Sequence, residues 1–345
     1  MNVPKVEMKG GNNKRSSRLW CTLKKEGNDL FFSLVDYRNN YFTSNDPEKI
    51  IEFYNGFENR DQLIQWMKER PNGTHTIYEV EGDNDIIVVI TTADFNGKFA
   101  NECRENIFKG LHIVFVESGG RDDFYFNYAR NCNVGIKKAM EYNPKWVVVS
   151  NDDAFKIDDV DALVNGLTKL DNKKYDTVFT LPPSRYHSHR ESIGKRNLVR
   201  SLFYSTYDSS HRIRKKIEDK YNINYMIRPG KGMSKIMLNN VENIILTQAF
   251  GIFSPNFLRK FTNGPYDLVY INNIEEFDLS YELNKEERRL GYINYRVGDY
   301  VGTSLGNGKD RWMRSLASEV YFNFKLENRL TPFEKFNPII LDSSH

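Results

Sequence analysis

Several features are scarce or missing in this chain of 345 residues, and each absence excludes a class of protein. The three cysteines, Cys21, Cys103 and Cys132, are an odd number without metal-site spacing. They exclude a disulfide scaffold and predict buried thiols in a reducing compartment. No apolar run is longer than a strand, which is far short of a membrane span. Residues 1–17 are polar and basic without an apolar segment, so we expect a disordered tail and no signal peptide.

Excess charge of one sign is scarce as well. The chain has 49 Lys and Arg against 46 Asp and Glu, which leaves a net charge of +3. A chain so close to neutrality has no overall nucleic-acid footprint, and we expect no nucleic-acid partner. The hydrophobic fraction of 39% and the charged fraction of 28% are those of a globular protein that is long enough for a sizeable core.

Apolar runs the length of a strand alternate with segments of helical periodicity. The helical segment after the second run carries its apolar and small residues on one stripe, from Tyr128 to Ala139. Strands that alternate with helices predict βαβ units, a parallel sheet and an α/β fold. The apolar runs span residues 86–90, 111–116, 146–149 and 177–181.

The third apolar run leads directly into the acidic triplet Asn151-Asp152-Asp153. The carboxyl edge of an open α/β sheet is where ligands bind, so these side chains are candidates for a functional site. Adjacent carboxylates repel each other and need a cation, a donor-rich ligand or water. The alternative is a solvated acidic turn that starts the next helix.

The same patterns divide the chain into segments. We expect a small N-terminal α/β extension, a first strand-and-helix half, a basic insertion, a second ordered half, and a C-terminal helix with a tail. After the tail at 1–17, these segments span residues 18–80, 81–181, 182–245, 246–305 and 306–345.

Residues 185–217 concentrate Arg, Lys and His among aromatic and aliphatic residues. A basic amphipathic helix of this composition suits an anionic membrane surface, or an element that faces an acceptor substrate. A solvated charged helix that covers the acceptor cleft is the alternative. We expect a cytoplasmic protein, and the basic segment adds peripheral binding to the inner face of a membrane as a hypothesis.

Four motifs, in this order along residues 85–305, carry a resemblance to a known family. Together they resemble the family 2 glycosyltransferases, whose GT-A fold is a Rossmann-like, mostly parallel sheet flanked by helices. In those enzymes the first two motifs lie in the nucleotide-sugar half and the last two in the acceptor half. The motifs are the helical segment 129–139, the triplet 151–153, Gly264-Pro265-Tyr266-Asp267 and Glu275-Glu276-Phe277-Asp278-Leu279.

The resemblance implies a metal-dependent, inverting glycosyltransferase of the hexosyltransferase type. Such an enzyme moves a sugar from a nucleoside diphosphate sugar to a hydroxyl of a glycan, lipid-linked or protein acceptor. A Mn²⁺ or Mg²⁺ ion would balance the charge of the leaving diphosphate. By the resemblance, Asp153 and Asn151 bind the metal, and Glu276 is the general base, with Glu275 and Asp278 as rival carboxylates. The implied donor-binding residues are Thr91, Thr92, Glu117, Arg130, Asn131 and Asp152.

The chain also departs from the family pattern. Asn151 stands where the family often has aspartate, and no histidine lies within reach of the end of the last strand, near residues 301–303. Lys309, Arg311 and the glycine-rich loop 306–308 are candidates to hold the diphosphate instead. The acidic residues at 275–278 also fit a plain helix N-terminus, where carboxylates complement the helix dipole.

Two other functions remain open at this point. One is a nucleotidyltransferase, which would normally have a glycine-rich basic signature after the first strand, where residues 91–98 carry none. The other is a non-catalytic binding protein derived from a transferase.

Overall fold

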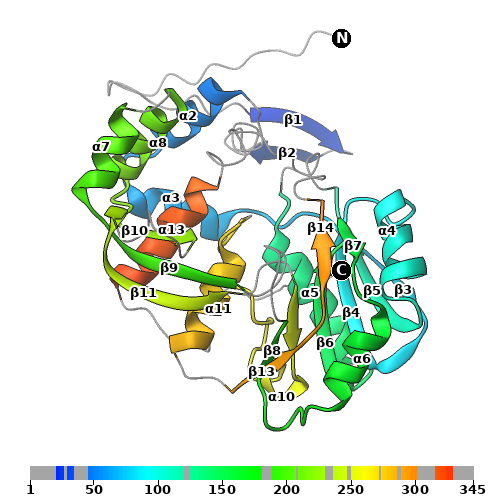
Figure 1. Cartoon of the computed structure of the whole chain (residues 1–345). Coiled ribbons are helices and arrows are strands. Elements are labelled where there is room, and N and C mark those ends of the chain that lie inside the picture. The colour runs from blue at the N-terminus through cyan, green and yellow to red at the C-terminus, as the bar shows by residue number, and fades with distance from the viewer. Residues whose placement is uncertain are drawn as a thin grey trace, which may run out of the picture.

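A seven-stranded sheet forms the main body of the computed structural model, in the order β13-β8-β12-β6-β4-β5-β3 (Figure 1). The structure describes residues 21–26, 29–34, 46–119, 125–180, 189–206, 209–229, 236–246, 250–271, 273–285, 289–300 and 315–328. The strands of the sheet are β3 (Thr76–Val80), β4 (Asp83–Thr92), β5 (Leu111–Glu117), β6 (Trp146–Asn151), β8 (Thr177–Thr180), β12 (Gly251–Phe253) and β13 (Leu290–Ile293).

This sheet confirms an α/β fold, and the sheet is mixed: β4, β5, β6, β8 and β13 run in one direction, and β3 and β12 run in the other. β4 runs parallel to β5 and β6, and β13 runs parallel to β8. β3 is antiparallel to β5, and β12 is antiparallel to both β6 and β8. The reason is connectivity: β12 follows the long insertion after β8 instead of a single crossover helix, so the chain enters the sheet from the opposite end.

Helices cover both faces of the sheet, because β4 alternates its side chains between two cores. Ile86, Val88 and Ile90 face the core under α4 (Lys98–Glu102), the π-helical turn η1 (Cys103–Ile107) and α6 (Val160–Thr168). Ile87 and Val89 face the core under α5 (Tyr128–Met140), α10 (Pro255–Leu258) and α11 (Glu275–Lys285).

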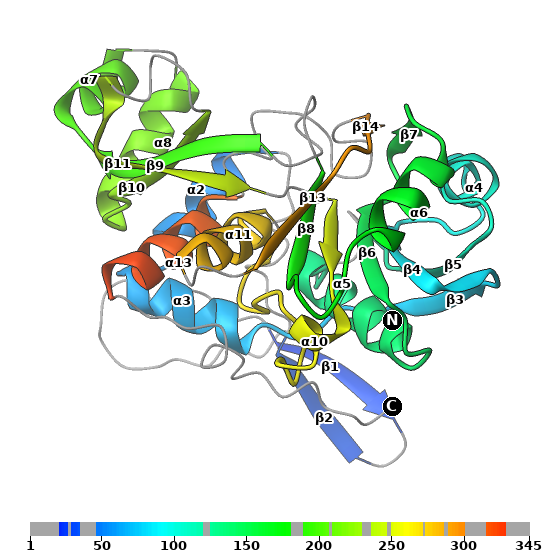
Figure 2. The same cartoon turned by 60° about the horizontal axis from the view of Figure 1, so that its bottom comes forward.

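A second part of the molecule lies beside the sheet, with α11 between the two parts (Figure 2). Leu279 and Leu283 of α11 pack into the core of the sheet, while Tyr281 packs into a third core that belongs to this second part. The third core joins α2 (Pro47–Asn55), α3 (Arg60–Glu69), α8 (Ser209–Lys220) and α13 (Leu316–Glu327).

The N-terminal helices α2 and α3 therefore share a core with elements from the far end of the chain, whereas β3 joins the large sheet. Two small antiparallel pairs lie outside the large sheet. They are the hairpin of β1 (Cys21–Glu26) and β2 (Asp29–Leu34), and the antiparallel pair of β7 (Ala154–Lys156) and β14 (Val297–Asp299).

The basic insertion is a small unit of mixed structure. A three-stranded antiparallel sheet, in the order β10-β9-β11, accompanies two helices. The elements are β9 (His189–Arg196), α7 (Leu198–Thr206), α8, β10 (Tyr225–Pro229) and β11 (Leu238–Leu246).

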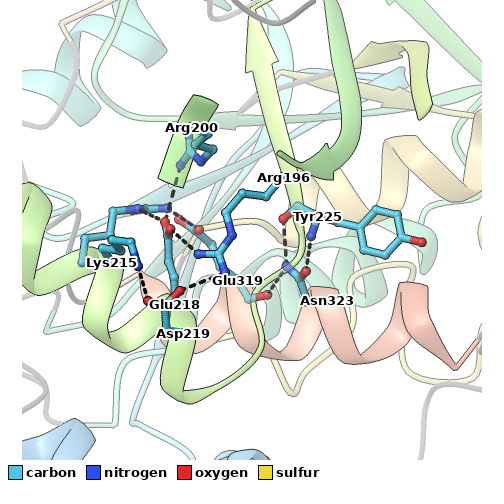
Figure 3. A network of polar contacts seen from close by, with 9 residues as sticks. Arg196, Arg200, Lys215, Glu218, Asp219, Tyr225, Glu319 and Asn323 are labelled. Carbon is cyan, nitrogen blue, oxygen red and sulfur yellow. Dashed lines mark hydrogen bonds and ion pairs between the residues drawn. The ribbon is translucent and has the colours of Figure 1, made fainter. Parts of the chain in front are cut away.

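Some of its arginines are internal, contrary to the expectation of a helix with its charges in solvent. Arg200 and Arg214 are buried, and both form ion pairs with the buried carboxylate of Glu218 (Figure 3). Arg214 also pairs with Glu319 of α13, so the network ties the insertion to the C-terminal helix. Among the described residues, no helix is long and apolar enough to cross a membrane.

Candidate active site at the carboxyl edge of the sheet

The strand register brings the predicted strand-end residues together. β4 lies between β5 and β6, so its last two residues have a neighbour on each side. Thr91 is paired with Asn151, and Thr92 with Glu117. Residues from three separate strands therefore meet at one edge of the sheet, as the sequence predicts.

Hydrogen bonds fix these side chains. The Thr92 hydroxyl donates to Oδ2 of Asp152 over 2.6 Å, and the Thr91 hydroxyl donates to Oδ1 of Asn151 over 3.1 Å. The amide of Asp152 donates to the carbonyl of Thr91. The two threonines therefore set the orientation of the turn that follows β6, and the amide oxygen of Asn151 is already bonded to a protein donor.

Asp152 titrates in an unusual environment. Burial raises the pKa of its carboxyl to about 6, the negative charge of Asp153 adds to the rise, and the hydrogen bond from Thr92 opposes it. Asp153 is buried to a similar extent, with 9% of its surface exposed against 7% for Asp152. Two adjacent carboxylates in a poorly solvated turn favour a cation as ligand.

The carboxylates of Asp152 and Asp153 fit Mg²⁺ or Mn²⁺ as a partial ligand set. Carboxylate oxygens are the ligands that these ions prefer, and Asp152 and Asp153 supply them. Within the described ranges, no three Asp, Glu, His or Cys side chains gather as a metal site. Such a pair suits an ion that takes one or two protein carboxylates and completes its shell with substrate phosphates and water.

The remaining residues that the resemblance assigns to donor binding differ in their contacts. Glu117 accepts a hydrogen bond from the amide of Phe95 over 2.7 Å, and so it anchors the loop after β4. Asn131 is buried and donates to the Ser118 hydroxyl, next to Glu117. Arg130 instead donates to the carbonyl of Gly73, so its guanidinium holds the segment before β3.

The three acidic residues of α11 are not equivalent. Glu275 and Asp278 are buried, and Asp278 forms an ion pair with Lys325 of α13. Lys325 also pairs with Asp267, which joins the two acceptor-side motifs. Glu276 is only partly buried. Of these carboxylates, Glu276 is therefore the one that combines a place in the first turn of the helix with access to solvent.

The backbone just before this helix breaks two local rules. Ile274 has a φ of 79°, an outlier for a β-branched residue. Its carbonyl accepts the first helical hydrogen bond, from the amide of Asp278, yet isoleucine has no side-chain oxygen to cap the helix. Strained backbone of this kind is found preferentially at functional sites. The strain at Ile274 therefore supports the start of α11 as part of the candidate site.

Helix α5 is hydrogen-bonded to the strand-end site and lies within electrostatic range of Glu276. Burial raises the pKa of Tyr128, and the nearby charge of Glu276 contributes to the rise. On the same turn of α5, Asn131 bonds to Ser118, whose amide donates to the carbonyl of Thr92. Thr92 in turn binds Asp152, so a short chain of hydrogen bonds runs from Asn131 of α5 to the strand-end carboxylates.

Gly264 explains how the third motif is held against α5. Its φ of 89° is left-handed, and a Cβ atom there would lie 2.3 Å from the Asn133 side chain. Asn133 uses this close approach to bond both the amide and the carbonyl of Tyr266. The loop that precedes α11 is thereby fixed to α5.

The sequence did not identify several residues that shape this site. Ser118 supports Asn131, and the Cys103 thiol donates to the carbonyl of Asp152. The Tyr300 amide donates to the carbonyl of Asp153, and its ring is 56% exposed beside that turn. No spacing signals these contacts, since each joins residues far apart in the chain. The candidates Lys309, Arg311 and 306–308 lie outside the described residues.

We expect Asp152 to make the stability of the ligand-free protein depend on pH. The folded state binds its proton more tightly than the unfolded chain does, so the unfolding free energy falls as pH rises from about 4 to about 6. A pKa change from 3.8 to about 6 corresponds to about 3 kcal/mol. Urea unfolding of the wild type and Asp152→Asn between pH 4.5 and 7 measures this contribution.

In that comparison, the variant should gain stability over the wild type as pH rises. Asp159→Asn is the matched control, because its side chain is 77% exposed in the next turn. A constant difference between wild type and Asp152→Asn across this range would contradict the prediction.

Comparison of the chain with protein-family models and with curated proteins finds no match.

Proposed function

We propose that this protein is a metal-dependent, inverting glycosyltransferase that uses a nucleoside diphosphate sugar and a hydroxyl acceptor. One observation carries the proposal. Asp152 and Asp153 lie at the carboxyl edge of the sheet beside Ser118, which Asn131 in the first turn of α5 binds, and the charge of the partly exposed Glu276 is felt by Tyr128 of the same turn, although these acids lie in different halves of the chain. The sequence resemblance assigns the metal and the base to these same positions.

The chemistry of such a transfer suits the groups present. A bound Mn²⁺ or Mg²⁺ would be held by Asp153, with Asp152 beside it, and would supply the positive charge that a diphosphate leaving group requires. Glu276 would accept the proton of the attacking hydroxyl as general base. Thr91, Thr92 and Glu117 would border the nucleoside, because they end the strands on either side. A nucleotidyltransferase and a non-catalytic binding protein stay as rivals, and no contact in the site favours either.

We expect metal-dependent nucleotide binding at this edge. Calorimetric titration of UDP and GDP should show binding that is stronger with Mn²⁺ than without it, and Asp153→Ala should remove the gain. Asp85→Ala is the matched control, because it removes the same charge from the opposite end of β4. If Asp153→Ala binds both nucleotides as the wild type does, the metal assignment fails.

Turnover separates the three functions. Release of nucleoside diphosphate from a panel of nucleotide sugars with Mn²⁺ supports the transferase. Release of pyrophosphate from a nucleoside triphosphate and a sugar phosphate would indicate the nucleotidyltransferase. Metal-dependent binding without either reaction would indicate a binding protein.

A further inference from the structure

The basic insertion exposes a group of aliphatic side chains. Of the nine large apolar side chains that are exposed in the described part of the chain, five lie in this unit. Leu198 is the most exposed, at 72%. Monomeric proteins seldom leave apolar side chains clustered in solvent without a binding role. These five residues, Leu198, Val199, Leu202, Ile236 and Val241, are called the aliphatic patch below.

Two contacts place the members of the patch that lie outside α7. The Asn197 side chain donates to the carbonyl of Ile236, which places Ile236 beside the first turn of α7. Val241 lies against Gly194 of β9, where a Cβ atom would come within 3.4 Å of the Val241 Cα. Both views show α7 at the outer edge of the molecule, on the opposite side of the small sheet from the seven-stranded sheet (Figures 1 and 2).

The unit that carries the patch is strongly basic. Residues 182–245 contain thirteen Lys and Arg against five Asp and Glu, a difference of eight positive charges in a chain whose net charge is +3. The buried ion pairs of Arg200 and Arg214 take up part of this charge. Lys195, Arg212 and Lys216 are exposed. A basic unit with an aliphatic patch is complementary to a surface that is anionic outside and apolar inside.

We propose that the aliphatic patch inserts into the interface of an anionic lipid bilayer, with the exposed basic residues of the unit at the headgroups. The charge disfavours a second copy of the chain as the occupant, because two such units would repel each other. The side chains disfavour single-stranded nucleic acid, which binds through aromatic stacking that Leu, Ile and Val do not provide. The inference does not depend on the reaction proposed above.

The test is co-sedimentation of the full chain with vesicles of phosphatidylcholine alone or with phosphatidylserine. We expect binding to the anionic vesicles that weakens at high salt. Leu198→Ser with Leu202→Ser should lower the partition coefficient about tenfold or more, because each leucine loses its apolar burial. Lys195→Ser with Arg212→Ser and Lys216→Ser should lower it to a similar extent. Arg214 is not substituted, because its side chain is buried and paired with Glu218.

The matched control is Ile157→Ser with Tyr292→Ser, two exposed apolar residues in other parts of the molecule. This control should bind vesicles as the wild type does, and circular dichroism checks that every variant is folded. Loss of binding in both the leucine variant and the basic-residue variant, with binding kept in the Ile157 and Tyr292 control, supports the proposal. Equal binding by the leucine variant and the wild type overturns it. So does a patch-dependent dimer in light scattering, or patch-dependent binding of an oligonucleotide, without vesicle binding.

Discussion

Replacement of Glu276 by Gln is expected to lower kcat by about 10²–10⁴-fold, with nucleotide affinity largely kept. Gln has the same size and hydrogen-bonding reach, so it removes only the ability to accept a proton. Glu276 is the partly exposed carboxylate of the first turn of α11, and its charge contributes to the raised pKa of Tyr128 in α5. Steady-state turnover of the donor sugar that the wild type uses, together with nucleotide titration, measures both effects.

Glu275→Gln is the natural control, because it makes the same change one residue earlier at a buried position. Asp278→Asn is a poorer control, since its carboxylate is paired with the buried Lys325 and its loss would disturb the fold. A larger loss of turnover in Glu275→Gln than in Glu276→Gln would move the base to Glu275. Equal turnover in Glu276→Gln and the wild type would remove the general-base role from Glu276.

The second large effect concerns stability. Glu218→Gln should lower the unfolding free energy by about 3–5 kcal/mol, the range for loss of one partner from a buried ion pair. Glu218 is fully buried and pairs with Arg196, Arg200 and Arg214 (Figure 3). Removal of its charge leaves the buried Arg200 and Arg214 with less compensation. Urea unfolding at pH 7 measures the change.

The next residue along α8 provides the control. Asp219 pairs with Arg196 and Lys215, but its side chain is 44% exposed. Asp219→Asn removes the same charge from a solvated site and should cost less than about 1 kcal/mol. Equal losses in the two variants would mean that burial does not set the strength of this network.

The network also explains how the insertion is placed. Arg214 reaches Glu319 of α13, and Asn323 of the same helix bonds to the amide and carbonyl of Tyr225 in β10. Helix α13 thus binds the basic insertion through Glu319 and Asn323. Its Lys325 pairs with Asp267 and Asp278. Helix α13 therefore contacts both the basic insertion, which carries the aliphatic patch, and helix α11.

The sequence by itself determined the elements whose signal is local. The apolar runs 86–90 and 146–149 lie within β4 and β6, and the stripe from Tyr128 to Ala139 lies within α5. Strand-end polar residues could be predicted because parallel neighbours end at the same edge. Thr91 and Asn151 consequently met as expected.

Only the tertiary structure decided the rest, because those features depend on pairings between distant residues. β12 is antiparallel to its neighbours because the chain reaches it through the long insertion. The hydrophobic periodicity of the sequence does not predict this path. Arg200 and Arg214 can be buried because Glu218 and Glu319 form ion pairs with them. From the sequence alone, both arginines would be expected in solvent. Leu198 is exposed because α7 turns Arg200 toward the protein interior. The two leucines of α7 are thereby left in solvent. A residue's type indicates what it can bind, and its packing decides whether it faces protein or solvent.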